Sequence, residues 1–348
     1  MTDRRYRVAQ WGTGFSGKVA LQALIGHPDF DLVGVKVYSD AKAGRDAGEL
    51  SGLGPTGVIA TKNIDDIIAA KPDCVVYMPA RYDLDDVCRL LESGINISTL
   101  LENFHDPESL DREVRQRIEA ACQRGGASIY SAGPSPGFIT ESVPLVLTSM
   151  QRRLDRLRIE EFADMSDRGD SPEMFALLGF GGEPAAELVS RLEQLTALHF
   201  GASLRQLATA VSLPLDDVTS TATVATAKSP VQIGGRTFEA GTVAAWRIEV
   251  SGIRHGKPLL QMVPTWWITR DLEPAWDIPF ERQGWRVRVD GDVPLDVTLQ
   301  FTWPTEEERA RSANGNVNRP VNAVPYVCQA PPGILSTFTL PQIIPTLS

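Results

Sequence analysis

The six residues Gly12–Gly17 near the start of the chain have the spacing GxGxxG. This spacing is typical of a dinucleotide-binding turn. The turn follows a strand-like segment, Arg5–Gln10, and leads into a helical pattern, Gly17–Ile25. In a GxGxxG turn the first glycine permits a tight bend, the second lets the backbone approach a pyrophosphate, and the third allows close helix packing. We therefore expect cofactor contacts from Gly12, Thr13, Gly14, Phe15, Ser16 and Gly17.

The same stretch also fits the GxxxxGK phosphate loop of proteins that bind nucleoside triphosphates. The residue after Lys18 is Val19, however, and valine has no hydroxyl to hold magnesium. The GxG pair would have no role in a loop of that kind. The motif therefore favours a dinucleotide over a nucleoside triphosphate.

The end of the second predicted strand, Asp31–Ser39, bears on the choice between NAD and NADP. An acidic residue at this point usually accepts a hydrogen bond from the ribose 2′-hydroxyl of NAD. Here Ser39 is followed by Lys42 and Arg45, which suits the 2′-phosphate of NADP. Asp40 could still serve a hydroxyl, and each of the two cations could equally be a solvated loop charge. We expect NADP, with NAD as the alternative, and Ser39, Lys42 and Arg45 as cofactor-binding residues.

A carboxylate at the end of a predicted strand is the candidate for proton transfer. Glu102 follows the apolar strand Asn96–Leu101. Ligands of an open parallel sheet bind beyond the carboxyl ends of its strands, so this side chain should face the nicotinamide ring. It could act there as a general base or an electrostatic stabiliser. The structural alternative is a loop acid bonded to nearby backbone.

Two other turns at predicted strand ends are candidates for contacts in the same cleft. Pro79, Ala80 and Arg81 could cover the cofactor phosphates and the nicotinamide ribose, and Gly133–Phe138 could present backbone groups to the nicotinamide amide. An apolar substrate pocket would be lined by Phe138, Phe162 and Met174, although ordinary core packing explains each of these residues as well.

Other catalytic patterns are weak in this sequence. Tyr38 and Lys42 have the YxxxK spacing of short-chain dehydrogenases, but that pair belongs on a helix, so we interpret the spacing as coincidence. The sequence has no GxSxG motif, no CxxC pair and no metal-ligand spacing. We therefore expect no metal, and the chemistry is left to the cofactor, one carboxylate and an apolar pocket.

The order of the helices and strands predicted around these residues is typical of an α/β protein. Strands alternate with helices over residues 1–140, which indicates a Rossmann-type doubly wound parallel sheet. Residues 141–305 carry long segments of alternating polarity after a helical stretch, Ser171–Leu213, broken near His199–Gly201. They predict an α+β substrate and dimerisation domain with an open, largely antiparallel sheet. Residues 306–348 should pack back on the first domain.

Composition excludes several classes of function. The chain has 348 residues and a formal net charge of -10, so nucleic acids and anionic membranes are poor partners. Its apolar runs are too short to span a bilayer, and the polar start Met1–Arg5 has no signal-peptide character. We expect a cytoplasmic protein. A large exposed sheet face in the second domain, rich in tryptophan, suggests a homodimer, and the alternative is that this face covers the substrate cleft.

Several segments together resemble one branch of the dihydrodipicolinate-reductase-like proteins, which contains 2,4-diaminopentanoate dehydrogenase and the native amine dehydrogenases. They are the glycine turn, Leu101–Asn103, the Gly133–Phe138 turn and the tail from Asn322 to Gly333. The resemblance spans most of the chain. It implies reversible reductive amination, in which a small ketone or aldehyde, ammonia and NAD(P)H give a primary amine, with Glu102 as the catalytic carboxylate.

The chain also departs from that family. Ser135 stands where the family turn often has asparagine, and the His-His…Lys segment of true dihydrodipicolinate reductases is absent, which argues against their activity. Two alternatives to amine dehydrogenation stay open. One is an NADP-dependent imine or carbonyl reductase that uses no ammonia, and the other is a non-catalytic NADP-sensing protein.

Overall fold

The computed structural model describes residues 5–166, 172–303, 305 and 313–347. The chain divides into two compact units. The first combines Met1–Phe138 with Arg311–Ser348, and the second is Ile139–Ala310. The first unit is therefore built from both ends of the chain.

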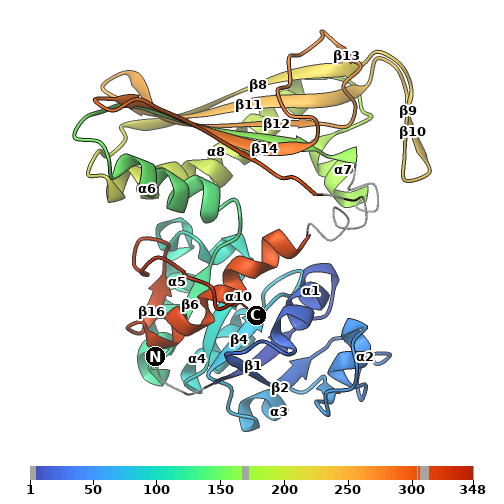
Figure 1. Cartoon of the computed structure of the whole chain (residues 1–348), viewed down its shortest axis with the longest axis vertical. Helices are drawn as coiled ribbons and strands as arrows, with labels where there is room; N and C mark the ends of the chain where they lie inside the picture. Colours follow the sequence, from blue (N-terminus) through green and yellow to red (C-terminus); the bar gives the residue numbers. More distant parts are fainter. Residues whose placement is uncertain (1–4, 167–171, 304, 306–312, 348) are drawn as a thin grey trace. The chain divides into compact units, whose positions relative to one another are not determined.

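The first unit is a parallel sheet with helices on both faces (Figure 1). In the described part of the chain its seven strands have the order β16-β6-β5-β4-β1-β2-β3, and every neighbouring pair is parallel. The strands are β1 (Tyr6–Trp11), β2 (Phe30–Lys36), β3 (Ala60–Thr61), β4 (Cys74–Tyr77), β5 (Asn96–Thr99), β6 (Ser128–Ser131) and β16 (Gly333–Leu335). The order reverses between β1 and β4, where a doubly wound sheet opens its ligand crevice. The Rossmann-type prediction is confirmed.

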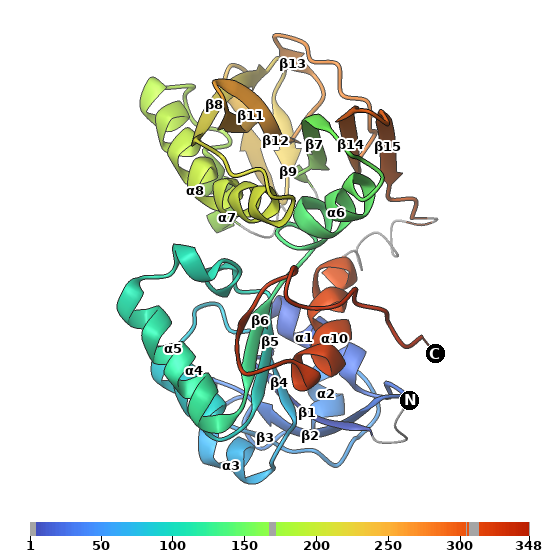
Figure 2. The ribbon, with the colours of Figure 1, turned by 90° about the vertical axis from the view of Figure 1, so that its left-hand side faces the viewer.

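Two groups of helices cover the two faces of this sheet (Figure 2). One face packs against α1 and α10 through residues such as Val8, Leu24 and Val321, and the other packs against α3, α4 and α5 through residues such as Leu90 and Ile118. The helices of this unit are α1 (Phe15–Leu24), α2 (Ala47–Ser51), α3 (Ile64–Ala69), α4 (Leu84–Glu92), α5 (Arg112–Gly125) and α10 (Ala313–Gln329).

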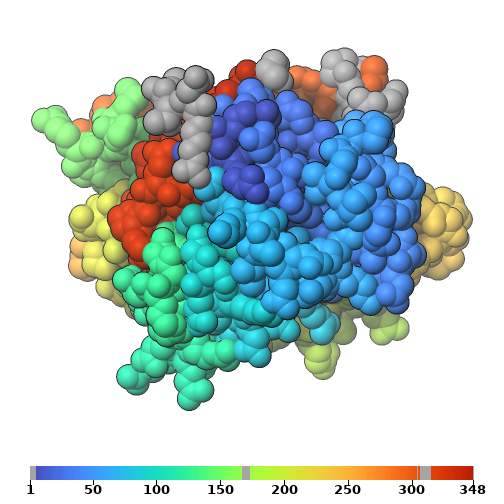
Figure 3. Space-filling model, turned by 90° about the horizontal axis from the view of Figure 1, so that it is seen from below, coloured from blue at the N-terminus to red at the C-terminus, as the bar shows by residue number. Residues whose placement is uncertain are grey.

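The end of the chain completes the first unit. The Ser98 hydroxyl of β5 donates to the Pro320 carbonyl of α10 at 2.6 Å, and β16 extends the sheet beyond β6. In the space-filling view the red C-terminal segment lies against the blue and green parts of this unit (Figure 3).

The second unit is a mixed sheet backed by helices. Its order among the described residues is β13-β8-β11-β12-β7-β14-β15, in which only the β7–β12 pair is parallel. Its elements are β7 (Leu154–Asp164), β8 (Asp217–Ala227), β11 (Val243–Arg254), β12 (Lys257–Trp267), β13 (Leu272–Glu273), β14 (Gln283–Gly291), β15 (Leu295–Gln300), α6 (Val143–Thr148), α7 (Pro172–Leu178) and α8 (Ala186–Ala210), with a separate hairpin, β9 (Val231–Ile233) and β10 (Arg236–Phe238). The largely antiparallel sheet is confirmed.

Several predicted element boundaries are wrong, for local physical reasons. The break expected near His199–Gly201 does not occur, because a side chain at Gly201 would come within 3.2 Å of Val218, so this glycine serves close packing inside α8. The sequence pattern predicts a long helix over Pro107–Arg124, but α5 begins only at Arg112, because the Asp111 carboxylate caps it by accepting from Glu113 N at 2.9 Å. Ser171, the predicted start of a helix, lies outside the described residues.

The sequence pattern also predicts a hairpin turn at Asp290-Gly291, and the observed turn is displaced by two residues. Asp290–Gly291 belongs to β14, and the turn starts at Asp292, whose carboxylate accepts hydrogen bonds from the backbone amides of Arg152 and Arg153. No helix in the described ranges is long and apolar enough to span a membrane.

Candidate functional site

The glycine turn between β1 and α1 is closely packed on its protein side. Gly12 has a φ of +85°, and a Cβ there would lie 2.8 Å from the Met78 carbonyl oxygen. A Cβ at Gly17 would lie 2.2 Å from the Gly12 carbonyl oxygen. These two glycines are therefore required by the fold itself, whether or not a ligand binds.

Gly14 is different, because nothing lies within 4 Å of the position its Cβ would take. It is the N-cap of α1 in an extended conformation, and no side chain caps the helix there. The first amide groups of a helix are orphan donors that carry partial positive charge, and they suit a phosphate group. The open space at Gly14 fits the close approach of a pyrophosphate, so the residues present fit a dinucleotide.

The buried amide side chain of Gln10 forms a hydrogen bond with the backbone of this turn. Gln10 Nε2 donates to the Gly12 carbonyl at 2.9 Å, and Gln10 Oε1 is buried without a hydrogen-bond partner among the described residues. Gln10 is not among the site residues predicted from the sequence. A polar residue in an apolar strand directly before a glycine turn is the signal that could have identified it.

The turn after β2 reaches the glycine turn through one lysine. Lys42 Nζ donates to the Thr13 carbonyl at 2.7 Å and to its hydroxyl at 3.2 Å. Arg45 instead pairs with Glu49 at 2.6 Å, and Ser39 is exposed on the same turn. Of the three residues predicted to select NADP, Lys42 is thus the one that contacts the glycine turn.

A buried lysine also lies at this end of β2. The Lys36 ammonium is 4.6 Å from the centre of the Tyr38 ring and 5.0 Å from that of Trp11. Burial lowers the pKa of Lys36, and burial also raises the pKa of Tyr38. Trp11 Nε1 donates to the Tyr38 hydroxyl at 2.8 Å, so the three side chains form one cluster.

The candidate catalytic carboxylate follows a firmly anchored strand. The Thr99 hydroxyl donates to the Tyr77 carbonyl at 2.5 Å and accepts from the Leu101 amide at 3.0 Å. The Ser131 hydroxyl donates to the Leu101 carbonyl at 2.8 Å. Buried groups of β4, β5 and β6 therefore fix the backbone directly before Glu102, whose own side chain is exposed at the carboxyl edge.

The other predicted cofactor contacts follow β4 and β6. Pro79 is buried beside the glycine turn, 3.4 Å from the position of a Cβ on Gly12, whereas Ala80 and Arg81 are exposed. In the turn after β6, the Gly133 amide donates to the Pro136 carbonyl at 2.7 Å, and the Phe138 amide donates to the Gly133 carbonyl at 3.0 Å. Phe138 is half-buried at the end of this turn.

The remaining pocket candidates belong to the second unit. Phe162 of β7 is 6% exposed, and its ring centre is 5.0 Å from that of Phe280. Met174 of α7 is half-buried and precedes Phe175, which packs on Phe180 and Phe238.

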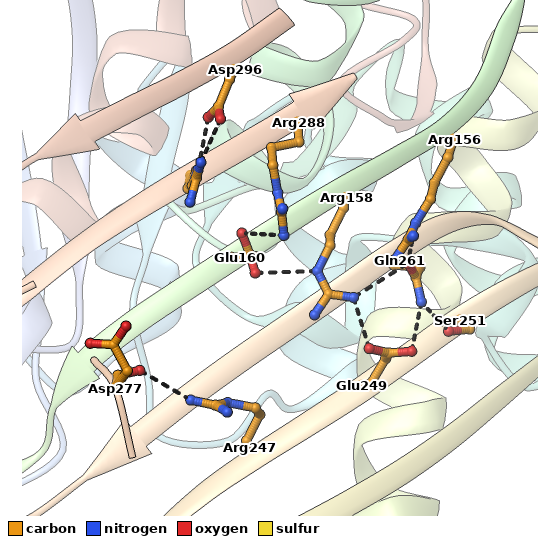
Figure 4. Close-up of polar contacts among 11 residues, drawn as sticks. Arg156, Arg158, Glu160, Arg247, Glu249, Ser251, Gln261, Asp277, Arg288 and Asp296 are labelled. Atoms are coloured by element: carbon orange, nitrogen blue, oxygen red, sulfur yellow. Dashed lines mark hydrogen bonds and ion pairs between the residues drawn. The ribbon is translucent and has the colours of Figure 1, made fainter. Parts of the chain in front are cut away.

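Charged side chains cover the sheet face of the second unit that points away from α8 (Figure 4). Arg158 lies between Glu160 and Glu249, at 3.2 Å and 2.7 Å, and Arg288 reaches Glu160 at 3.1 Å. The tryptophans expected to be exposed on this sheet are not exposed. The buried ones are Trp246, Trp267 and Trp285.

Comparisons with known proteins find a relative by sequence and a relative by fold. An amine dehydrogenase from Streptomyces virginiae is 32% identical to this chain, and the match covers 95% of each chain. The structure of an amine dehydrogenase from Mycobacterium smegmatis matches with a TM-score of 0.75 at 20% identity, covering 99% of this chain and 97% of that one, which shows the same fold. No protein-family model matches the chain.

The contrast between two glycines gives the first prediction. We expect Gly14→Ala to change the free energy of unfolding by less than about 1 kcal/mol, because the new methyl enters open space. The same methyl should lower the affinity for NADPH at least about tenfold, because it occupies space offered to the pyrophosphate. Urea unfolding and isothermal titration calorimetry measure the two effects.

Gly17→Ala is the matched control. Its methyl overlaps the Gly12 carbonyl, so this variant should lose stability even without ligand. Wild-type affinity of Gly14→Ala for NADPH would contradict the prediction that the cofactor pyrophosphate binds at the open space beside Gly14.

Proposed function

The chain belongs to the amine dehydrogenase family, and from this premise we propose that it catalyses reversible reductive amination of a small ketone or aldehyde with ammonia. It is an oxidoreductase that uses a nicotinamide cofactor. The observation that carries the proposal is the anchored Glu102 at the same edge of the sheet as the open glycine turn. A carbonyl compound, ammonium and NADPH give a primary amine, water and NADP⁺.

Glu102 supplies the proton transfers that this reaction needs. Ammonia attacks a carbonyl carbon only as the neutral molecule, so a base must remove the proton of ammonium. The resulting carbinolamine must lose water, and the Glu102 carboxylic acid returns that proton to the leaving hydroxyl. The carboxylate then faces a cationic iminium and stabilises it electrostatically. One side chain can therefore serve all three steps.

The bound cofactor supplies the hydride that reduces the iminium. The glycine turn would hold its pyrophosphate through the amide groups at the start of α1. We propose that NADP is preferred over NAD, with Lys42, Ser39 and Arg45 near the 2′-phosphate. The position of Lys42 Nζ supports this preference. It donates to the Thr13 carbonyl, so the ammonium lies beside the glycine turn, where the adenosine half of the cofactor would begin. Phe138, Phe162 and Met174 are the proposed apolar lining for the substrate.

We also propose that the enzyme is a homodimer joined through the charged sheet face of the second unit. Arginines and carboxylates alternate across neighbouring strands of this face, so a second copy can offer each charge an opposite one. Thr219, Thr221 and Thr223 continue the face as exposed residues of β8.

The catalytic role of Glu102 is tested by its uncharged analogue. We expect Glu102→Gln to lower kcat for ammonium-dependent NADPH oxidation by roughly 100-fold or more, because the amide can neither accept nor return a proton. The affinity for NADPH should stay within about threefold of wild type, because the glycine turn is unchanged. Initial rates with a panel of small ketones, with and without ammonium, measure the effect.

Glu113→Gln, an exposed acid in the first turn of α5, is the control and should keep wild-type rates. Wild-type turnover in Glu102→Gln would overturn the role of Glu102. Equal rates with and without ammonium would favour a carbonyl reductase, and tight NADPH binding without any turnover would favour a sensing protein.

The proposed cofactor preference rests on Lys42. We expect Lys42→Met to weaken NADPH binding at least about tenfold and NADH binding much less, because only NADPH carries a 2′-phosphate that can pair with the ammonium. Calorimetric titrations with both cofactors measure the ratio. An equal loss for the two cofactors would show that Lys42 only braces Thr13, which would contradict a role in specificity.

The dimer is tested on its exposed edge. We expect Thr221→Arg to shift the enzyme from dimer to monomer in size-exclusion chromatography with light scattering, because it adds bulk and charge to a matched face. Thr209→Arg, on an exposed position of α8, should leave the dimer intact. A wild-type chain that is monomeric at micromolar concentration would disprove the interface.

A further inference from the structure

Two exposed aromatic side chains lie at the carboxyl edge of the first sheet, one in the glycine turn and one after β2. Phe15 is 69% exposed and Tyr38 is 54% exposed, and no other aromatic side chain in the described ranges is exposed to this degree. Phe15 opens α1, and Tyr38 follows the end of β2. An exposed aromatic ring loses little conformational entropy when it binds a flat partner, so these positions suit the planar rings of a dinucleotide.

The Tyr38 ring is held in place by its neighbours. Trp11 Nε1 donates to its hydroxyl at 2.8 Å, and the ammonium of Lys36 lies over the ring at 4.6 Å from the centre. Lys36 is only 7% exposed, so the cation is enclosed on the protein side of the ring. The exposed part of the ring is therefore turned outward and fixed in orientation before any ligand arrives.

The position of Tyr38 selects one half of the dinucleotide. The adenosine ribose of a dinucleotide lies at the end of the second strand of such a sheet, while the pyrophosphate lies at the glycine turn. Tyr38 is one residue before Ser39, in the segment that Lys42 joins to Thr13. The ring thus lies beside the expected place of adenosine.

We propose that the outer face of the Tyr38 ring is the platform on which the adenine ring of the cofactor stacks. The proposal rests on the proposed function only in that it needs a dinucleotide at the glycine turn. It assigns binding of the adenine ring to a residue whose YxxxK spacing with Lys42 we interpret as coincidence rather than as an acid–base pair. The hydrogen bonds do not form such a pair, because the Tyr38 hydroxyl accepts from Trp11 and Lys42 Nζ donates to Thr13.

The test separates adenine from the rest of the cofactor. Isothermal titration calorimetry with 5′-AMP and with 2′,5′-ADP measures the adenosine half alone, and nicotinamide mononucleotide measures the other half. We expect Tyr38→Leu to weaken both adenine ligands by about 5- to 100-fold, the range typical of one lost base stack. Nicotinamide mononucleotide should bind as it does to the wild type.

Two further variants keep the result interpretable. Tyr38→Phe retains the ring and should bind 5′-AMP within about threefold of wild type, which separates stacking from the hydroxyl contact with Trp11. Leu53→Ala changes another exposed side chain of the same unit and should bind 5′-AMP normally. Urea unfolding of each variant identifies any loss of affinity that comes from misfolding.

Wild-type affinity of Tyr38→Leu for 5′-AMP would overturn the proposal, and so would an equal loss for nicotinamide mononucleotide. A stacking effect found in a chain without amine dehydrogenase activity would leave this inference standing and reject only the proposed reaction.

Discussion

The first unit depends on one close approach of backbone to backbone at the start of α1. A methyl group on residue 17 would lie 2.2 Å from the Gly12 carbonyl oxygen, so only glycine lets the helix begin this near the turn. That approach leaves the first amides of α1 at the carboxyl edge of the sheet, where no side chain caps them. The turn is packed on one side and open on the other. An anionic ligand can satisfy the open donors without disturbing the core beneath.

At the same edge of the sheet, the side chains that hold the backbone differ from those proposed to contact ligands. Buried polar side chains hold the backbone: Gln10 holds the glycine turn, and Thr99 and Ser131 hold the residues before Glu102. Two of the groups proposed to touch ligands, Glu102 and Tyr38, are exposed. Anchored backbone fixes the point from which the Glu102 side chain extends, and in the proposed reaction its exposure would let it exchange protons with ammonium. In a chain with a formal net charge of -10, Lys36 and Lys42 also concentrate positive charge at the end of β2.

Local patterns predicted much of this arrangement. The alternation of strands and helices and the spacing of the glycine turn are properties of short segments, and both are found in the structure. Features set by distant partners were not predictable. Gly201 predicts a break in a helix, but in the structure it lets α8 pack closely against Val218. The tryptophans Trp246, Trp267 and Trp285 of the second unit are buried by packing that the sequence alone does not show. Lys36 lies in a predicted strand, and nothing in its sequence position predicts its contact with the Tyr38 ring. The assignments of individual site residues stay predictions.

The most direct test of the account follows the nitrogen atom. The enzyme is incubated with NADPH, ¹⁵N-labelled ammonium and the ketone that supports the fastest NADPH oxidation, and the products are analysed by mass spectrometry. Reductive amination predicts a primary amine that carries the label, with one amine formed for each NADPH consumed. An unlabelled alcohol formed in step with NADPH oxidation would contradict it.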